Sequence, residues 1–89
     1  MQKEKLILKN ETGLHARPAS IFVDKAGQFT SDIKIASKGK EVNAKSIMSV
    51  MSLGIDGGDE ILLKIEGDDE EKASKSLKKL INEKLPEEE

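Results

Sequence analysis

The chain has no cysteine, tryptophan or tyrosine, and its only aromatic residues are Phe22 and Phe29. Without cysteine there is no disulfide framework, thiol nucleophile or cysteine-ligated metal, and such a chain suits a reducing compartment. Modules that bind RNA on a sheet stack bases on exposed aromatic side chains of their central strands. The segments with strand character carry no aromatic residue, so the sequence argues against that class.

Long apolar runs and a strong net charge are also missing. The formal net charge is −2, which gives no basic field for nucleic acid or an anionic membrane. The apolar run near the N-terminus, Leu6-Ile7-Leu8, is too short for a signal sequence or a membrane span. With 89 residues, the chain is expected to be a single cytoplasmic domain over residues 1–89 with one hydrophobic core.

Apolar residues that alternate with polar ones predict four strands. Leu6 and Leu8 share one face of the first predicted strand, over residues 4–9, and Ile7 faces the other side. The second strand surrounds residues 33–35, the third covers 41–43 and the fourth lies around 61–65. The stretch Ser37-Lys38-Gly39-Lys40 is typical of a hairpin turn between the second and third strands.

Two helices are predicted by apolar residues at helical spacing and by residues that favour helix ends. The first has Pro18 in its first turn and Gly27 at its end, with His15 or a close neighbour as its N-cap. The second covers residues 47–53 between an N-cap at Ser46 and a stop at Gly54. The apolar stripe of the first helix consists of Ala16, Ala19, Phe22, Val23 and Ala26.

A third helix ends the chain. Asp68 is its predicted N-cap, with Glu71 completing a capping box. Its buried stripe is predicted at Ala73, Leu77, Leu80 and Ile81, and residues 86–89 are expected to form a frayed acidic tail. The element order is strand, helix, strand, strand, helix, strand, helix, which predicts an α+β fold of two layers, an antiparallel sheet with helices on one face.

His15 is the only histidine, and it lies between a loop and a predicted helix start. The unpaired N–H groups and the dipole of a helix N-terminus attract an anion, such as a phosphoryl group on the imidazole. Arg17 has the charge and the donors to bind the oxygens of that group. Position alone leaves a plain alternative, in which His15 is an ordinary loop or capping histidine. A zinc site and a Ser-His-Asp hydrolase are poorly supported, because cysteine ligands and a nucleophile-elbow motif are missing.

Two motifs resemble those of the HPr family, the histidine phosphocarriers of the bacterial phosphoenolpyruvate-dependent sugar phosphotransferase system. The stretch Gly13-Leu14-His15-Ala16-Arg17-Pro18-Ala19 is similar to the family's active-site motif. The stretch Lys45-Ser46-Ile47-Met48-Ser49-Val50-Met51-Ser52-Leu53-Gly54 is similar to its regulatory serine motif. The order and separation of the motifs agree with the family, and so do chain length and element order, so that the resemblance covers nearly the whole chain. It implies an open-faced sandwich with sheet order 1-4-2-3 and three helices.

The resemblance also implies a function. His15 would accept a phosphoryl group on Nδ1 from phosphorylated Enzyme I and pass it to the IIA component of a sugar permease, while Arg17 steadies the group. The protein would be a carrier rather than an enzyme, with no cofactor and no metal. It would bind no nucleic acid and no membrane, and a monomer is the simplest state for such a carrier.

Ser46 matches the serine that HPr kinase/phosphorylase modifies in relatives, which lowers transfer at the histidine and promotes binding to a catabolite-control transcription regulator. Ser46 can be the N-cap of its helix as well as a phosphorylation site, since the two roles do not exclude each other. In a helix of about seven residues, Val50 and Leu53 are expected in the core, and the apolar neighbours are expected to be partly exposed. These exposed neighbours are Ile47, Met48 and Met51. The resemblance places them in one docking patch with Ala16, Arg17 and Ser20.

Three rival functions fit the sequence less well. The first is a member of the same family that acts only in regulation, or in a nitrogen-linked branch of the phosphotransferase system. A serine-only variant lacks the histidine, whereas this chain has it. An RNA-binding module lacks the aromatic residues it needs, and an enzyme acting alone lacks a cluster of titratable groups beyond His15 and Arg17.

Overall fold

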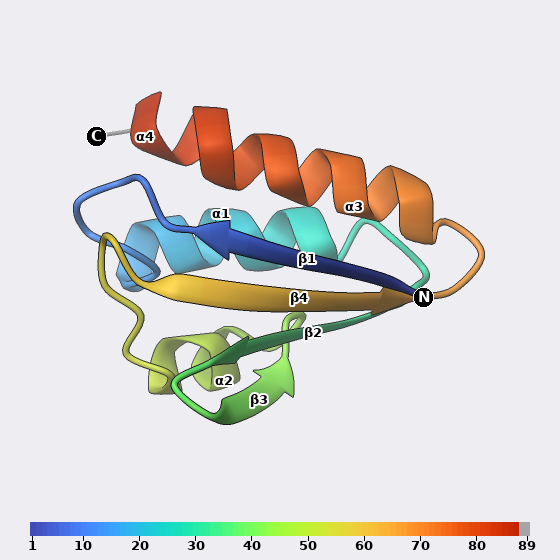
Figure 1. Cartoon of the computed structure of the whole chain (residues 1–89), viewed down its shortest axis with the longest axis horizontal. Coiled ribbons are helices and arrows are strands. Elements are labelled where there is room, and N and C mark those ends of the chain that lie inside the picture. The colour runs from blue at the N-terminus through green and yellow to red at the C-terminus, as the bar shows by residue number, and fades with distance from the viewer. Residues whose placement is uncertain (88–89) are drawn as a thin grey trace.

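The computed structural model describes residues 1–87, which form four strands and three helical regions (Figure 1). The third helical region is continuous and passes through a wider π-helical turn. In chain order the elements are β1 (Gln2–Ile7), α1 (Ala16–Ala26), β2 (Asp32–Ser37), β3 (Lys40–Asn43), α2 (Ile47–Ser52), β4 (Glu60–Glu66), α3 (Glu70–Lys79), the π-turn η1 (Leu80–Lys84) and α4 (Leu85–Glu87).

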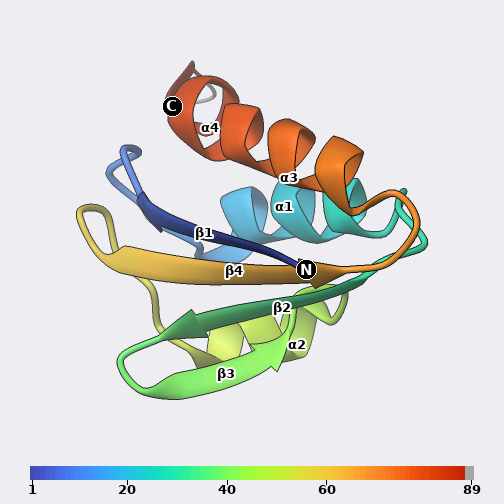
Figure 2. The ribbon, with the colours of Figure 1, turned by 45° about the vertical axis from the view of Figure 1, so that its right-hand side comes forward.

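The strands form one sheet in the order β1-β4-β2-β3, with every neighbouring pair antiparallel. The helices lie on one face of this sheet (Figure 2). The fold class and the strand order expected from the sequence are therefore confirmed. The first strand begins two residues earlier than predicted, at Gln2, and ends at Ile7.

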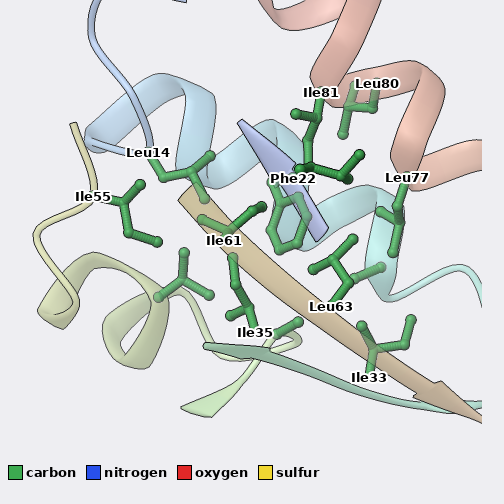
Figure 3. Close-up of a cluster of buried hydrophobic side chains, with 14 of the residues drawn as sticks. Leu14, Phe22, Ile33, Ile35, Ile55, Ile61, Leu63, Leu77, Leu80 and Ile81 are labelled. Atoms are coloured by element: carbon green, nitrogen blue, oxygen red, sulfur yellow. The ribbon is translucent and has the colours of Figure 1, made fainter. Parts of the chain in front are cut away.

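The core lies between the sheet and the helices. Alternate residues of the strands point into it: Leu6 is buried, whereas Ile7 on the other face is 53% exposed. Phe22 of α1 is fully buried among side chains of β4 and the C-terminal helical region (Figure 3). Burying a large apolar side chain contributes roughly 1.5–3 kcal/mol, so this shared core holds α1 and the loop before it in place.

The hairpin between β2 and β3 has the two-residue turn that the sequence predicts. Both central residues have positive φ, 53° at Lys38 and 81° at Gly39. That pattern is typical of a type I′ turn, whose twist matches that of the flanking strands. The turn thereby sets the register in which Ser37 pairs with Lys40.

The start of α3 differs from the prediction. The N-cap is Asp69 rather than Asp68, and the carboxylate of Asp69 makes no capping bond within the helix. It accepts instead from the backbone N–H groups of Thr30 and Ser31, at 2.9 and 3.0 Å, and from the Ser31 hydroxyl. The predicted capping box of Asp68 and Glu71 is therefore wrong: the helix starts one residue later, and it is Glu70 that accepts from the N–H of Gly67, at 3.1 Å.

This contact predicts a pH dependence of stability. Hydrogen bonds from Ser31 and Thr30 lower the pKa of Asp69 from its ordinary 3.8 to about 2. A carboxyl with a depressed folded-state pKa stabilises the fold above its unfolded value, and that contribution disappears as the pH falls through the folded value. We expect Asp69→Asn to unfold more readily than the wild type at neutral pH, with the two stabilities converging towards pH 2. Urea titrations at several pH values measure this, and a constant difference at all pH values would contradict it.

The C-terminal helical region includes two residues that the sequence assigns to the tail. Leu85 is buried, and α4 continues the helical path to Glu87. The N–H of Leu85 donates to the carbonyl of Leu80, five residues back, as a π-turn requires. Pro86 and Glu87 of the expected tail thus belong to this last helical turn, next to the buried Leu85. The last two tail residues, 88 and 89, lie outside the described residues.

Candidate functional site

His15 is the N-cap residue of α1, as the sequence predicts. Its backbone is extended and its side chain makes no capping bond, while its carbonyl accepts from Ala19 N at 2.8 Å. The imidazole therefore does not fold back onto the helix, and it is 53% exposed. The helix starts here because Pro18 fits the first turn and Ala19 and Phe22 enter the core. The position gives a histidine in solvent beside the positive end of the helix dipole.

The loop before His15 is fixed by close packing against the segment between α2 and β4. Leu14 is fully buried, and its N–H donates to the carbonyl of Ile55 at 2.9 Å. The Asn10 amide donates to the carbonyl of Gly13 at 2.7 Å. Gly13 has a φ of +62°, and a Cβ there would lie 2.3 Å from the Ile55 oxygen. Only glycine can therefore occupy position 13, two residues before His15, where the backbone of this loop lies against that of Ile55.

That packing brings Asp56 to the histidine. Nε2 of His15 lies 2.7 Å from Oδ1 of Asp56, a hydrogen bond between residues 41 apart in the chain. The Asp56 N–H donates to Oδ2 of Asp59 at 2.8 Å, and Lys38 Nζ lies 3.2 Å from the same oxygen. The Asp56 amide and Lys38 lower the pKa of Asp59. Sequence reasoning missed Asp56, because the stretch Asp56-Gly57-Gly58-Asp59 has the pattern of an ordinary turn and carries no sign of its spatial neighbour.

Arg17 lies in the first turn of α1, two residues beyond His15, and is exposed. Its guanidinium makes no ion pair with any of the residues 1–87. The structure thus places His15 and Arg17 on the same helix end without a direct bond between them. A guanidinium without an internal partner is free to bind an incoming anion.

Ser46 is the N-cap of α2 and accepts from Ser49 N at 3.3 Å, as the sequence predicts. Gly54 follows the helix with a φ of +61°. Ser46 is half-buried, and α2 contacts α1. The second sequence motif therefore lies on the element beside the one that begins at His15.

The short helix α2 divides its apolar residues between core and surface. Val50 and Leu53 are buried, whereas Met48 is 80% exposed and Ile47 and Met51 are about half as exposed, at 38% and 43%. This confirms the exposure predicted for these residues. On α1, Ala16 is exposed and Ser20 is half-buried. Apolar side chains in solvent next to a second helix are typical of a binding surface, and methionine adapts to surfaces of different shape.

Residues 1–87 give no support for a metal site or for a membrane-spanning helix. Within the described part of the chain, no three acidic, histidine or cysteine residues are grouped so as to hold a metal ion. None of the helices in residues 1–87 has the length and apolar character that a membrane crossing requires. Among residues 1–87, the arrangement offers the exposed imidazole of His15, the Asp56 carboxylate on its Nε2 and the guanidinium of Arg17, which forms no ion pair there.

Comparison with known proteins identifies the family. Residues 2–83 match the family model described as the PTS HPr component phosphorylation site, where PTS denotes the phosphotransferase system. The chain is 44% identical over 85 residues to the HPr-like protein Crh of Bacillus subtilis, covering 96% of this chain and 100% of that protein. It is 45% identical over 82 residues to the phosphocarrier protein HPr of Mycoplasma pneumoniae, covering 91% and 93%.

Solved structures of HPr proteins have the same fold as this chain. HPr-C-His from Thermoanaerobacter tengcongensis superposes with a TM-score of 0.92 at 50% identity, covering 96% of each chain. An HPr dimer from the same organism gives a TM-score of 0.76, also at 50% identity, covering 96% of this chain and 98% of that one. The resemblance seen in the two sequence motifs is thus confirmed over almost the whole length, and the chain belongs to the HPr family, the phosphocarriers of the phosphotransferase system.

Proposed function

We propose that this protein accepts a phosphoryl group on His15 from phosphorylated Enzyme I and donates it to the IIA components of sugar permeases. The observation that carries the proposal is the exposed imidazole at the N-cap of α1. A carrier must meet a donor and an acceptor in turn, so its phosphoryl group has to lie at the surface. A deep pocket would hold the group against transfer.

Phosphoryl transfer to His15 needs a neutral imidazole as the nucleophile and groups that stabilise the negative charge of the phosphoryl oxygens. The lone pair of Nδ1 attacks phosphorus, the N–P bond forms, and the bond between phosphorus and the donor breaks with its electron pair left on the donor. The first N–H within the helix to find a partner is that of Ala19. The amides of Ala16 and Arg17 precede it, and Pro18 has none, so these two N–H groups are placed to face the phosphoryl oxygens. Such a helix end stabilises an anion by about 0.3–1 kcal/mol.

Arg17 completes the site in this proposal. Its guanidinium supplies charge-assisted hydrogen bonds to the phosphoryl oxygens. These bonds are modest in solvent, which suits a group that has to leave again. The remaining catalytic groups belong to Enzyme I and to the IIA component, so the protein is a carrier and not an enzyme, and it uses no cofactor beyond the phosphoryl group derived from phosphoenolpyruvate.

The docking patch, Ala16, Arg17, Ser20, Ile47, Met48 and Met51, is proposed as the shared surface for these partners. Its centre is apolar and exposed on α2, and Arg17 gives it a positive charge. A partner with apolar residues and an acidic rim fits such a surface. We further propose that the carrier works as a monomer in the cytoplasm, because both partners have to reach the same patch.

Ser46 is proposed as a regulatory phosphorylation site for HPr kinase/phosphorylase, with a catabolite-control transcription regulator as the partner of the modified form. The similarity to a protein named Crh supports a role in catabolite regulation. A phosphate at the N-cap of α2 would add about 1.5–2 negative charges beside the docking patch. These charges repel an acidic partner and thereby lower transfer to His15.

Ser46→Asp tests this regulation against a matched control, Ser46→Asn. Both residues cap helices well, so both variants should unfold within about 1 kcal/mol of the wild type. Only aspartate adds charge, and we expect it to slow phosphorylation by Enzyme I roughly three- to tenfold, as repulsion of about 1 kcal/mol would do. Initial rates at low salt measure the effect. Equal rates for the two variants would contradict a role for charge at this position.

The carrier function itself is tested by mixing the protein with phosphoenolpyruvate and Enzyme I, followed by a IIA component. We expect a single acid-labile phosphoryl adduct by intact mass, which disappears as the IIA component gains the group. Absence of an adduct on folded protein, with Enzyme I from several sources, would contradict the carrier function. It would leave a purely regulatory role through Ser46.

A further inference from the structure

Asp56 provides the hydrogen bond that holds the His15 ring from outside α1. Its Oδ1 lies 2.7 Å from Nε2, and both side chains are more than half exposed, at 65% for Asp56 and 53% for His15. We propose that Asp56 is a positioning residue for phosphoryl transfer: it keeps the proton on Nε2, directs the lone pair to Nδ1 and balances the charge of the ring while Nδ1 carries the phosphoryl group. This inference rests on the proposed carrier function of His15.

The geometry is built into the fold, since the loop that carries Asp56 is held on both sides. A Cβ at Gly57 would lie 2.4 Å from the Asn10 oxygen. The N–H of Gly58 donates to the carbonyl of Leu8 at 2.8 Å, and the Asp56 N–H is bound by Asp59. Backbone this close leaves the loop little freedom. The carboxylate is therefore presented to the ring by packed backbone, although the side chains themselves are in solvent.

The protonation of the ring gives this contact its role. When Nε2 donates to a carboxylate, the neutral imidazole has its proton on Nε2 and its lone pair on Nδ1. Attack on phosphorus forms the Nδ1–P bond without loss of the Nε2 proton, so the ring acquires a positive charge that faces Asp56. On donation the N–P bond breaks, its electron pair returns to Nδ1, and the proton is still on Nε2. No proton has to be taken up or released in either step.

The charged groups of this region come from the loop before β4, from α1 and from the turn between β2 and β3. Asp56 and Asp59 belong to the loop before β4, and Asp59 is paired with Lys38. Arg17 comes from α1. Asp56 is the carboxylate bonded to the ring itself, so its removal should alter the protonation of the phosphorylated ring more than any other single change in this loop.

Lability of the phosphoryl group reports on that proton. Loss of phosphoryl from a ring protonated on Nε2 releases neutral imidazole, whereas loss from the deprotonated ring would have to release an imidazolate, a much poorer leaving group. The rate of phosphoryl loss therefore falls as the pH rises through the deprotonation of Nε2. An exposed carboxylate bound to Nε2 stabilises the protonated ring, so it should keep the phosphoryl group labile at higher pH.

The experiment phosphorylates His15 chemically with phosphoramidate, which releases ammonia and needs no Enzyme I, and follows phosphoryl loss from pH 5 to 10. We expect phosphoryl loss from Asp56→Ala and from Asp56→Asn to begin to slow at lower pH than in the wild type. At alkaline pH, phosphoryl loss from these variants should be about threefold slower than from the wild type. The control is Asp24→Asn, which removes one exposed carboxylate from α1 without touching the ring.

Each result separates the two proposals. Profiles of the Asp56 variants that coincide with the wild-type profile, on protein shown folded by NMR, would overturn the role of Asp56 and leave the carrier function intact. A shift of equal size in Asp24→Asn would overturn it as well, because net charge alone would then explain the effect. An adduct that forms with phosphoramidate but never with Enzyme I would count against the carrier function and not against Asp56.

Discussion

His15→Ala will lose the acid-labile adduct completely in an assay with phosphoenolpyruvate and Enzyme I. The chain has a single histidine, so no second imidazole can take over. Alanine lacks a nucleophilic nitrogen, and the amides at the start of α1 cannot form a covalent bond to phosphorus. We expect the signal of the adduct to fall to the background of the assay, because no other residue can replace the nucleophile. Intact mass before and after mild acid treatment measures it.

Two controls keep this result specific. His15 is exposed and makes no capping bond, so His15→Ala should unfold close to the wild type, within about 1 kcal/mol. Ser46→Ala should still form the acid-labile adduct, because its serine belongs to a different helix. A surviving acid-labile adduct in His15→Ala would show that another residue carries the group.

The second large effect concerns stability, in Gly13→Ala. A Cβ at residue 13 would lie 2.3 Å from the Ile55 oxygen and 2.5 Å from the carbonyl carbon of Asp56. Both contacts are backbone atoms, which cannot rotate away as a side chain can. The positive φ adds roughly 1–2 kcal/mol for a residue other than glycine. We expect the free energy of unfolding to fall by about 3 kcal/mol or more, since the loops must separate.

Gly54→Ala is the matched control, because Gly54 has nearly the same φ, +61° against +62°, and a Cβ added there would meet no atom of a distant residue within 4 Å. It should lose only the conformational term, about 1–2 kcal/mol. Urea denaturation of both variants measures the difference. Equal losses would show that the approach of the two loops is not tight in solution. Because the same approach brings Asp56 to His15, Gly13→Ala should also weaken that contact.

The local part of the fold was predictable because its causes lie within each element. Alternation at Ile61, Leu63 and Ile65 reflects burial on one face of a strand. The pair Lys38-Gly39 is read directly as a two-residue turn, since glycine favours positive φ. The N-cap roles of His15 and Ser46 follow from the residues next to them. These features need no knowledge of distant segments.

The features that were missed depend on contacts between distant segments. The carboxylate of Asp69 serves residues 30 and 31 rather than its own helix, which no local capping rule contains. Burial of Leu85 extends the C-terminal helix past the expected end. Asp56 lies beside His15 because two loops pack through Gly13 and Gly57, and a sequence pattern shows the glycines without showing what they approach.

The most direct test of the central claim is the location of the phosphoryl group. Protein labelled with ¹⁵N is phosphorylated by Enzyme I and phosphoenolpyruvate, and the ¹⁵N–³¹P coupling of its histidine ring is measured by NMR. The carrier function predicts one coupled nitrogen, Nδ1 of His15, with Nε2 uncoupled and protonated beside Asp56. A phosphoryl group found on Nε2, or on a residue other than His15, would contradict it.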